Sequence, residues 1–146
     1  MGLARIELTE HGLTDLSNLL LRLQRELFVV GAELATDASK ADRLEDGVTR
    51  VSELMLESVE AELATWEARV TMPREFVIPG ETRASAALEL ARSVLRRSER
   101  RIVSLAAAEP VGEWLMAYVN RVADLLWVLA RAAEQAEHAS PTKLRG

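Results

Sequence analysis

The chain has 146 residues, of which 49% are hydrophobic, 4% aromatic and 28% charged, and its formal net charge is −5. This length allows one domain with a buried core, and the apolar content excludes a disordered chain. The absence of cysteine excludes disulfides, thiolate metal sites and cysteine nucleophiles. No stretch approaches the roughly 18 apolar residues that a membrane span needs, and the start of the chain does not resemble a signal peptide, so we expect a cytoplasmic protein.

Four helical segments are predicted from apolar residues that recur every three or four positions. The first spans about residues 14–35 and the second about 44–70, with a polar loop between them. Two prolines and a glycine interrupt the pattern in residues 70–82, which predicts a structured loop there. The third helix spans about residues 83–107, and after a turn containing a proline the fourth runs from residue 111 or 112 to about 137.

These segments predict the fold class. Alanine and leucine dominate the composition, and neither an internal repeat nor an alternating strand pattern is present. The sequence therefore predicts a single domain over residues 1–146, all-α, folded as an antiparallel bundle of four main helices. The first 13 residues and residues 138–146 are expected to be loose. Because apolar residues cover more than one helical face, self-association is expected as well.

The third predicted helix carries an unusual concentration of arginine. Six arginines lie in the stretch R-A-S-A-A-L-E-L-A-R-S-V-L-R-R-S-E-R-R, and three of them recur every fourth residue, at Arg92, Arg96 and Arg100. Side chains four apart lie on one face of a helix, and guanidinium groups suit phosphate or carboxylate. Two interpretations stay open: a ridge that holds an anionic ligand, or a solvated face whose arginines pair with glutamates.

Several other chemistries are excluded by what the chain lacks. The two histidines, His11 and His138, do not follow a glutamate at the spacing of di-iron bundles, and no zinc ligand set is present. Neither a P-loop nor a Gly-x-Gly-x-x-Gly pattern occurs. The negative net charge, and the lack of aromatics among the arginines, argue against a nucleic-acid partner.

Four stretches carry a family resemblance: L-L-R-L-Q-R-E-L-F-V-V-G-A-E-L-A-T, F-V-I-P-G, the arginine helix, and Y-V-N-R-V-A-D-L-L-W-V-L-A-R. In order and spacing they resemble the ATP:cob(I)alamin adenosyltransferases of the propanediol-utilisation type, over roughly residues 12–131. The resemblance implies a homotrimer of helical bundles that binds its small-molecule ligands at subunit interfaces. It implies transfer of the 5′-deoxyadenosyl group from ATP, with magnesium, to cob(I)alamin and release of triphosphate.

The resemblance also implies roles for five residues. Arg96 matches the arginine that contacts the ATP phosphates and is needed for catalysis. Arg92 matches one that pairs with an aspartate of the neighbouring subunit and shapes the ATP pocket. Glu99 matches a glutamate that orders the arginine helix, and Asn120 a residue that lines the nucleotide site. Phe76 matches the aromatic beside the corrin that keeps the lower axial ligand off cobalt. Fixed guanidinium groups suit a leaving triphosphate, which gains charge.

Two departures from the family leave alternatives open. The chain is expected to lack the family's N-terminal phosphate-binding loop and first helix, and Glu81 stands where the family has glycine. A carboxylate directed inward there would repel triphosphate. The protein is therefore a working adenosyltransferase, a non-catalytic corrinoid-binding module that keeps Phe76, or a repurposed scaffold or enzyme. In the last case, Glu81 and Arg97 would serve another small molecule as acid, base or anion clamp.

Overall fold

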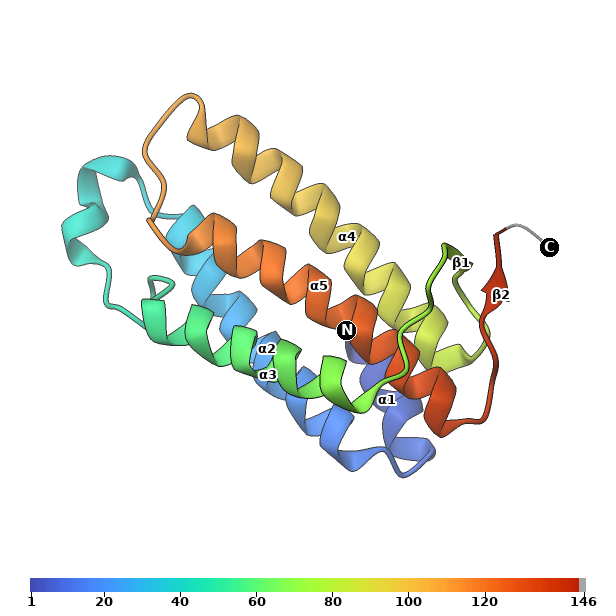
Figure 1. Ribbon diagram of the computed structural model, residues 1–146. Coiled ribbons are helices and arrows are strands. Elements are labelled where there is room, and N and C mark those ends of the chain that lie inside the picture. The colour runs from blue at the N-terminus through green and yellow to red at the C-terminus, as the bar shows by residue number, and fades with distance from the viewer. Residues whose placement is uncertain (145–146) are drawn as a thin grey trace.

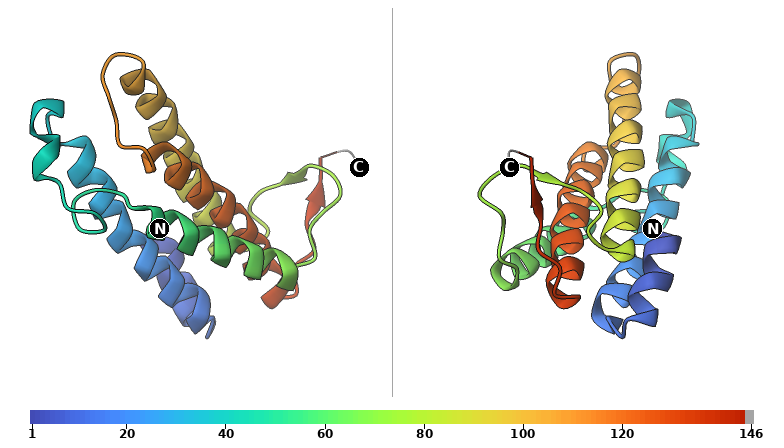
Figure 2. Two further views of the ribbon diagram at one scale, coloured as in Figure 1. Left: turned by 60° about the vertical axis from the view of Figure 1, so that its left-hand side comes forward. Right: turned by 90° about the vertical axis from the view of Figure 1, so that its right-hand side faces the viewer.

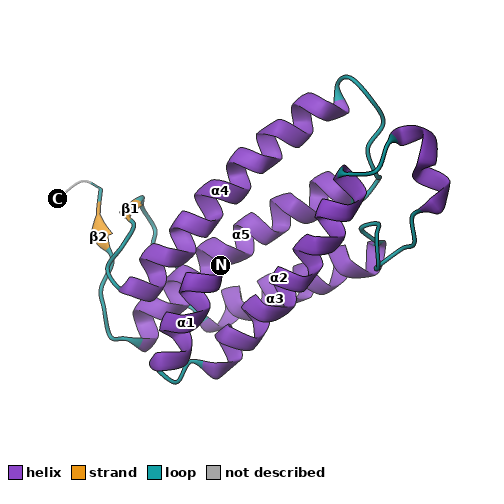
Figure 3. Cartoon of the chain, turned by 180° about the vertical axis from the view of Figure 1, so that it is seen from behind, coloured by secondary structure: helices purple, strands orange, loops and turns teal. Residues whose placement is uncertain are grey.

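The computed structural model describes residues 1–144, which form a helical bundle as predicted. Within them lie α1 (Gly2–Glu10), α2 (Thr14–Leu34), the 3-10 helix η1 (Ala38–Arg43), α3 (Glu53–Arg69), α4 (Arg83–Ala106) and α5 (Leu115–Ala136) (Figure 1). Two short strands, β1 (Val77–Ile78) and β2 (Thr142–Lys143), complete the elements (Figure 3). None of the described helices is both long and apolar enough to cross a membrane.

α5 is the central helix of the bundle. It packs against α4 on one side and α3 on the other, with α2 also in contact (Figure 1). Most of its residues are buried, in keeping with the apolar run L-L-W-V-L-A, because neighbours cover it around most of its circumference. Tyr118 is fully buried on α5, and its hydroxyl donates a hydrogen bond of 2.5 Å to Oε2 of Glu26 on α2.

The N-terminal residues differ from the expectation that they are loose. Gly2–Glu10 form α1, which packs against α2 and α4, and its Ala4 and Leu8 are fully buried. Gly12 ends the helix at φ 71°, which lets the N–H of Leu13 donate to the carbonyl of Leu8 at 2.8 Å. A helix this short has no strong sequence signal, since burial against its neighbours rather than propensity stabilises it.

The second predicted helix is shorter than expected. It was predicted over residues 44–70, but α3 occupies only Glu53–Arg69. Gly47 takes φ 76° in a tight turn, and the Ser52 side chain caps α3 by accepting the N–H three residues later at 3.3 Å. Val48, which fits the apolar spacing of a helix, is 57% exposed. The turn at Gly47 and the cap at Ser52 therefore start the helix at Glu53, although the apolar spacing predicts an earlier start.

The C-terminal segment is also ordered, against the expectation for residues 138–146. β2 pairs with β1 in antiparallel register, Val77 opposite Lys143 and Ile78 opposite Thr142. The two strands stand at one end of the bundle, beside the helices (Figure 2). Because the pairing joins distant parts of the chain, no local pattern predicts it. Residues 145–146 lie outside the described residues.

An apolar surface is exposed between α1, α2 and α4. A groove of about 560 Å³ runs between α1, α2 and α4. We define the outer apolar face as the four exposed side chains that line it, Leu3, Phe28, Leu90 and Val94. Phe28 is 82% exposed. Apolar exposure on this scale is typical of an interaction surface.

Truncating the buried face of α1 should destabilise the whole bundle. We expect Leu8→Ala to lower the free energy of unfolding by about 2–5 kcal/mol, because it leaves a cavity at a fully buried position. Urea unfolding followed by circular dichroism measures the change. Ile6→Ala on the same helix is the control, since Ile6 is 58% exposed and lies outside the outer apolar face. Equal effects of the two substitutions would mean that α1 is not part of the core.

Candidate active site

A cavity of about 820 Å³ opens between the loop that follows α3, the N-terminal half of α4 and the C-terminal half of α5. We call it the Phe76 cavity, and its lining residues are Pro73, Arg74, Glu75, Phe76, Val77, Pro79, Glu89, Arg92, Trp127 and Leu144. Phe76 is 82% and Leu144 57% exposed. The cavity therefore combines uncovered apolar side chains with guanidinium groups, a combination that suits a largely apolar ligand carrying an anionic group.

The loop that carries Phe76 is held by the C-terminal strand. The N–H of Leu144 donates to the carbonyl of Phe76 at 2.9 Å. Nζ of Lys143 lies 2.7 Å from Oε1 of Glu75. These contacts lie beside the β1–β2 pairing, so the backbone on either side of the exposed Phe76 ring is fixed.

Glu81 is engaged by the same strand. Its Oε1 accepts a hydrogen bond of 3.0 Å from the N–H of Thr142. This hydrogen bond lowers the pKa of the Glu81 carboxyl below its ordinary value. Glu81 does not line the Phe76 cavity. Its carboxylate therefore serves as an anchor for the C-terminal strand.

The arginine ridge lies on α4, as predicted, and Thr82 and Ser85 form a capping box at its start. Arg92 lines the Phe76 cavity and its NH1 lies 3.4 Å from Oε2 of Glu89, one turn earlier. Because Arg92 is only partly buried and weakly paired, most of its donors stay available to a ligand.

One turn further along α4, three predicted site residues meet. NH1 of Arg96 lies 2.6 Å from Oε2 of Glu99, and Oε1 of Glu99 accepts a hydrogen bond of 3.0 Å from Asn120 on α5. The structure thus links Arg96, Glu99 and Asn120 across the α4–α5 interface. They do not line the Phe76 cavity itself, so the candidate site has two adjoining parts along α4.

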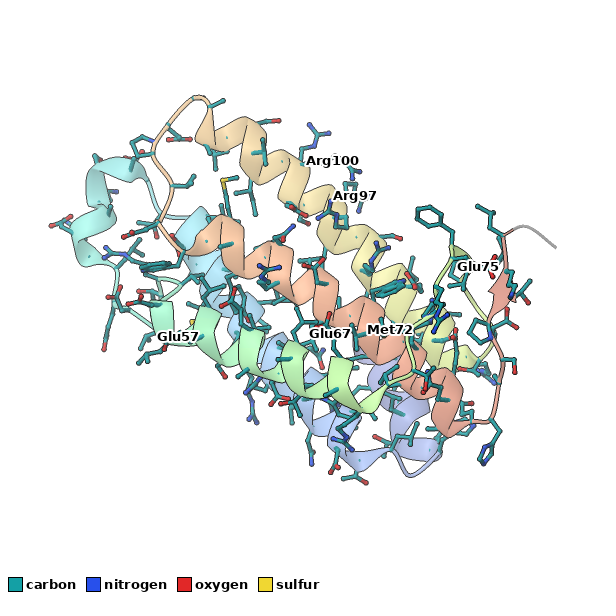
Figure 4. All side chains as sticks on the ribbon, in the orientation of Figure 1. Glu57, Glu67, Met72, Glu75, Arg97 and Arg100 are labelled. Atoms are coloured by element: carbon teal, nitrogen blue, oxygen red, sulfur yellow. The ribbon has the colours of Figure 1, made fainter. Side chains whose placement is uncertain are left out.

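Of the other four arginines in this stretch, Arg83 pairs with Glu7 on α1 at 3.1 Å and three face solvent. Arg97, Arg100 and Arg101 are exposed, and Arg97 and Arg100 project from the outer side of α4 (Figure 4). Within residues 1–144 none of the three forms an ion pair. The ridge therefore divides into partly buried arginines between α4 and α5, at Arg92 and Arg96, and a solvated outer set.

Sequence reasoning missed the charged residues behind the cavity wall. NH2 of Arg131 lies 2.7 Å from Oε1 of Glu134 and 3.5 Å from Oε1 of Glu89. Arg131 and Glu134 are each 1% exposed. Their spacing of three residues was a usable signal, but the apolar run before them predicted only a core helix. Within residues 1–144 no group of three or more acidic, histidine or cysteine side chains is placed to hold a metal ion.

The match to known proteins is extensive. Residues 1–133 match the cobalamin adenosyltransferase family. The corrinoid adenosyltransferase of Bacillus subtilis (strain 168) is 32% identical over 132 residues, which are 90% of this chain and 65% of that protein. The chain belongs to the cobalamin adenosyltransferase family. A second relative, corrinoid adenosyltransferase PduO of Salmonella typhimurium, is 37% identical over 120 residues, 82% of this chain and 35% of that protein.

Solved structures of family members have the same fold. A phenylalanine-to-alanine variant of the PduO-type ATP:corrinoid adenosyltransferase from Lactobacillus reuteri, complexed with cobalamin and ATP, superposes with a TM-score of 0.88 at 28% identity, covering 99% of this chain and 78% of that one. An arginine-to-lysine variant complexed with ATP gives a TM-score of 0.85 at 28% identity, over the same shares of both chains.

The family match extends over nearly the whole chain, but the relatives are longer. The chain spans 65% of the Bacillus protein and 35% of the Salmonella protein. The expected absence of the family's phosphate-binding loop and first helix is not confirmed by these matches. In the structure, α1 stands before α2 and packs against the arginine helix α4.

The anchor formed by Glu81 should depend on pH. Because its pKa is lowered in the folded protein, the contact with Thr142 stabilises the strand at pH above the ordinary value of 4.5 and is lost as pH falls through the lower folded value. In an NMR titration, the Thr142 amide signal should shift with a midpoint below 4.5. Glu81→Gln should abolish that shift, and a midpoint at or above the ordinary value would contradict the anchor.

Proposed function

We propose that this protein transfers the 5′-deoxyadenosyl group of ATP to cob(I)alamin and releases triphosphate. One observation carries the proposal: the linked Arg96, Glu99 and Asn120 adjoin, along α4, a cavity that presents both Arg92 and Phe76. Anion-binding and apolar surfaces thereby meet at one place, as a substrate pair of a nucleotide and a corrin requires. Membership of the family, and the solved Lactobacillus relative complexed with cobalamin and ATP, support the same activity.

The arginines of α4 bind the triphosphate of ATP in the proposed reaction. The reduced cobalt attacks C5′ of ATP, the C5′–O bond breaks, and its electron pair stays on the triphosphate oxygen. Arg96 and Arg92 stabilise the charge that develops on the leaving triphosphate. Glu99 positions Arg96 through their 2.6 Å ion pair, and Asn120 fixes Glu99 through the 3.0 Å hydrogen bond.

The loop that carries Phe76 contacts the corrin in the proposed reaction. The 82% exposed ring of Phe76 supplies apolar contact beside the corrin. By its resemblance to the family, it would also keep the lower axial ligand off cobalt. Its position is fixed because the neighbouring backbone and Glu75 are bound to the C-terminal strand. Magnesium bound to ATP would neutralise part of the phosphate charge. We place this reaction in the cytoplasm.

The alternative functions have less support from the geometry. A repurposed site that uses Glu81 as acid or base would need a free carboxylate, but Glu81 is bound to Thr142 outside the cavity. Calorimetric titration with ATP and with cobalamin separates the functions. Binding of both ligands supports the adenosyltransferase, binding of cobalamin alone indicates a corrinoid-binding module, and binding of neither indicates a repurposed bundle.

Removing the Arg96 side chain should stop the reaction without unfolding the protein. We expect Arg96→Ala to lower kcat by about a hundredfold or more, the usual cost of losing a donor that stabilises developing charge. Stopped assays of adenosylcobalamin formation measure it, with urea unfolding alongside. Arg100→Ala is the control, because Arg100 is exposed on the same helix and outside the proposed site. Undiminished turnover in Arg96→Ala would remove this residue from catalysis.

We also propose that the protein is a homotrimer in which a second copy covers the outer apolar face. Phe28→Asp should then shift light-scattering masses from trimer towards monomer, because a charge at a buried interface is costly. The matched control is Leu54→Asp on α3, since Leu54 is 75% exposed and lies outside this face. A trimer that persists in the Phe28 variant would place the interface elsewhere.

A further inference from the structure

Four charged side chains form an alternating series from the Phe76 cavity into the core. Arg92 lies on the cavity wall, 3.4 Å from Oε2 of Glu89. The other oxygen of Glu89 lies 3.5 Å from NH2 of Arg131, and the same NH2 lies 2.7 Å from Oε1 of Glu134. The carboxylate of Glu89 is therefore shared between two guanidinium groups, one open to a ligand and one enclosed.

The inner pair of this series, Arg131 and Glu134, costs folding free energy that a purely structural role does not explain. Arg131 and Glu134 are each 1% exposed. Among residues 1–144, Arg131 Nε and NH1 and Glu134 Oε2 have no hydrogen-bond partner. Buried ion pairs stabilise a fold little or not at all relative to apolar residues of the same size. Unpaired donors and acceptors add to that cost. A role in stability alone does not account for such a pair directly behind a cavity wall.

The charges of the series indicate what the inner pair does. Two positive and two negative groups sum to zero. Without Arg131, the three remaining groups, Arg92, Glu89 and Glu134, would carry a net charge of −1 at the cavity wall. Glu89 would also be free to bind Arg92 more closely and occupy the donors that face the ligand. In a low-dielectric interior, a single uncompensated charge acts over the whole width of such a site.

We propose that Arg131 and Glu134 together set the affinity of the Arg92 site for a polyphosphate. Arg131 is a positioning residue: it neutralises Glu89 and holds that carboxylate back from Arg92. Glu134 moderates the positive charge of Arg131, so that the anion is bound but also released. The inference rests on the proposed function, in which Arg92 faces the triphosphate of ATP.

The test exploits the opposite charges of the inner pair. Both Arg131→Met and Glu134→Gln break the same buried contact, so a merely structural role predicts the same direction of change for both. Electrostatic tuning predicts opposite directions. By isothermal titration calorimetry with inorganic triphosphate, we expect Arg131→Met to raise Kd about tenfold and Glu134→Gln to lower it about threefold.

Three further variants complete the design. Arg131→Lys keeps the charge, and because the tuning is electrostatic it should leave Kd within about twofold of the natural protein. The double variant Arg131→Met/Glu134→Gln restores the charge balance and should also return Kd to within about twofold of the natural protein. If Arg131→Met alone does not fold, the double variant and Glu134→Gln together decide between the two roles. Glu62→Gln is the matched control, because it removes one negative charge from the Arg22 ion pair between α2 and α3. Its Kd should not change.

The outcomes separate this inference from the proposed function. Kd shifts of one sign in both single variants, or no shift, overturn the inference even if adenosyl transfer is observed. Opposite shifts without any transfer to cob(I)alamin uphold the inference and overturn the proposed reaction. No binding of triphosphate by the natural protein overturns the anion site at Arg92 and the inference with it.

Discussion

α5 is buried along most of its length, so each polar side chain on it needs a partner on a neighbouring helix. Tyr118 has Glu26 of α2, and Asn120 has Glu99 of α4. Near the C-terminal end, Arg131 has Glu89 of α4. The contacts of Asn120 and Arg131 fix the rotation and axial position of α4 against α5. The placement of the ridge arginines follows from them, because a helix that is locked at several points cannot present a different face.

The two parts of the candidate site are held by different kinds of structure. The anion-binding part, around Arg92 and Arg96, is built from side chains on two packed helices. Sites on helices are held rigidly, which suits charges that must be in place before a bond breaks. The apolar part, at Phe76, is built from a loop and the C-terminal strand. This loop is held at its ends by the strand pairing, so the exposed Phe76 ring stands on a fixed backbone.

The sequence predicted α2 and α4 well, because their apolar stripes are long and clear boundary signals surround them. It could not predict the turn before α3, where Gly47 adopts a backbone conformation that no periodicity encodes. It grouped Arg96 with Glu99 and Asn120 only through a family resemblance, since helical spacing does not reveal which residues of two helices meet. The Arg131–Glu134 pair was hidden for the same reason: spacing suggests the pair, but only packing shows that it is buried beside Glu89.

The β1–β2 pairing also bears on how the protein folds. The Glu81–Thr142 hydrogen bond connects residues 61 positions apart, whereas each helix closes through contacts four residues apart. Distant contacts form late, because the entropy of closing the intervening chain must be overcome before they contribute stability. A refolding molecule therefore recovers its helices before the β1–β2 pairing holds the loop that carries Phe76. For a short interval it has an assembled arginine ridge and an apolar wall that is still open.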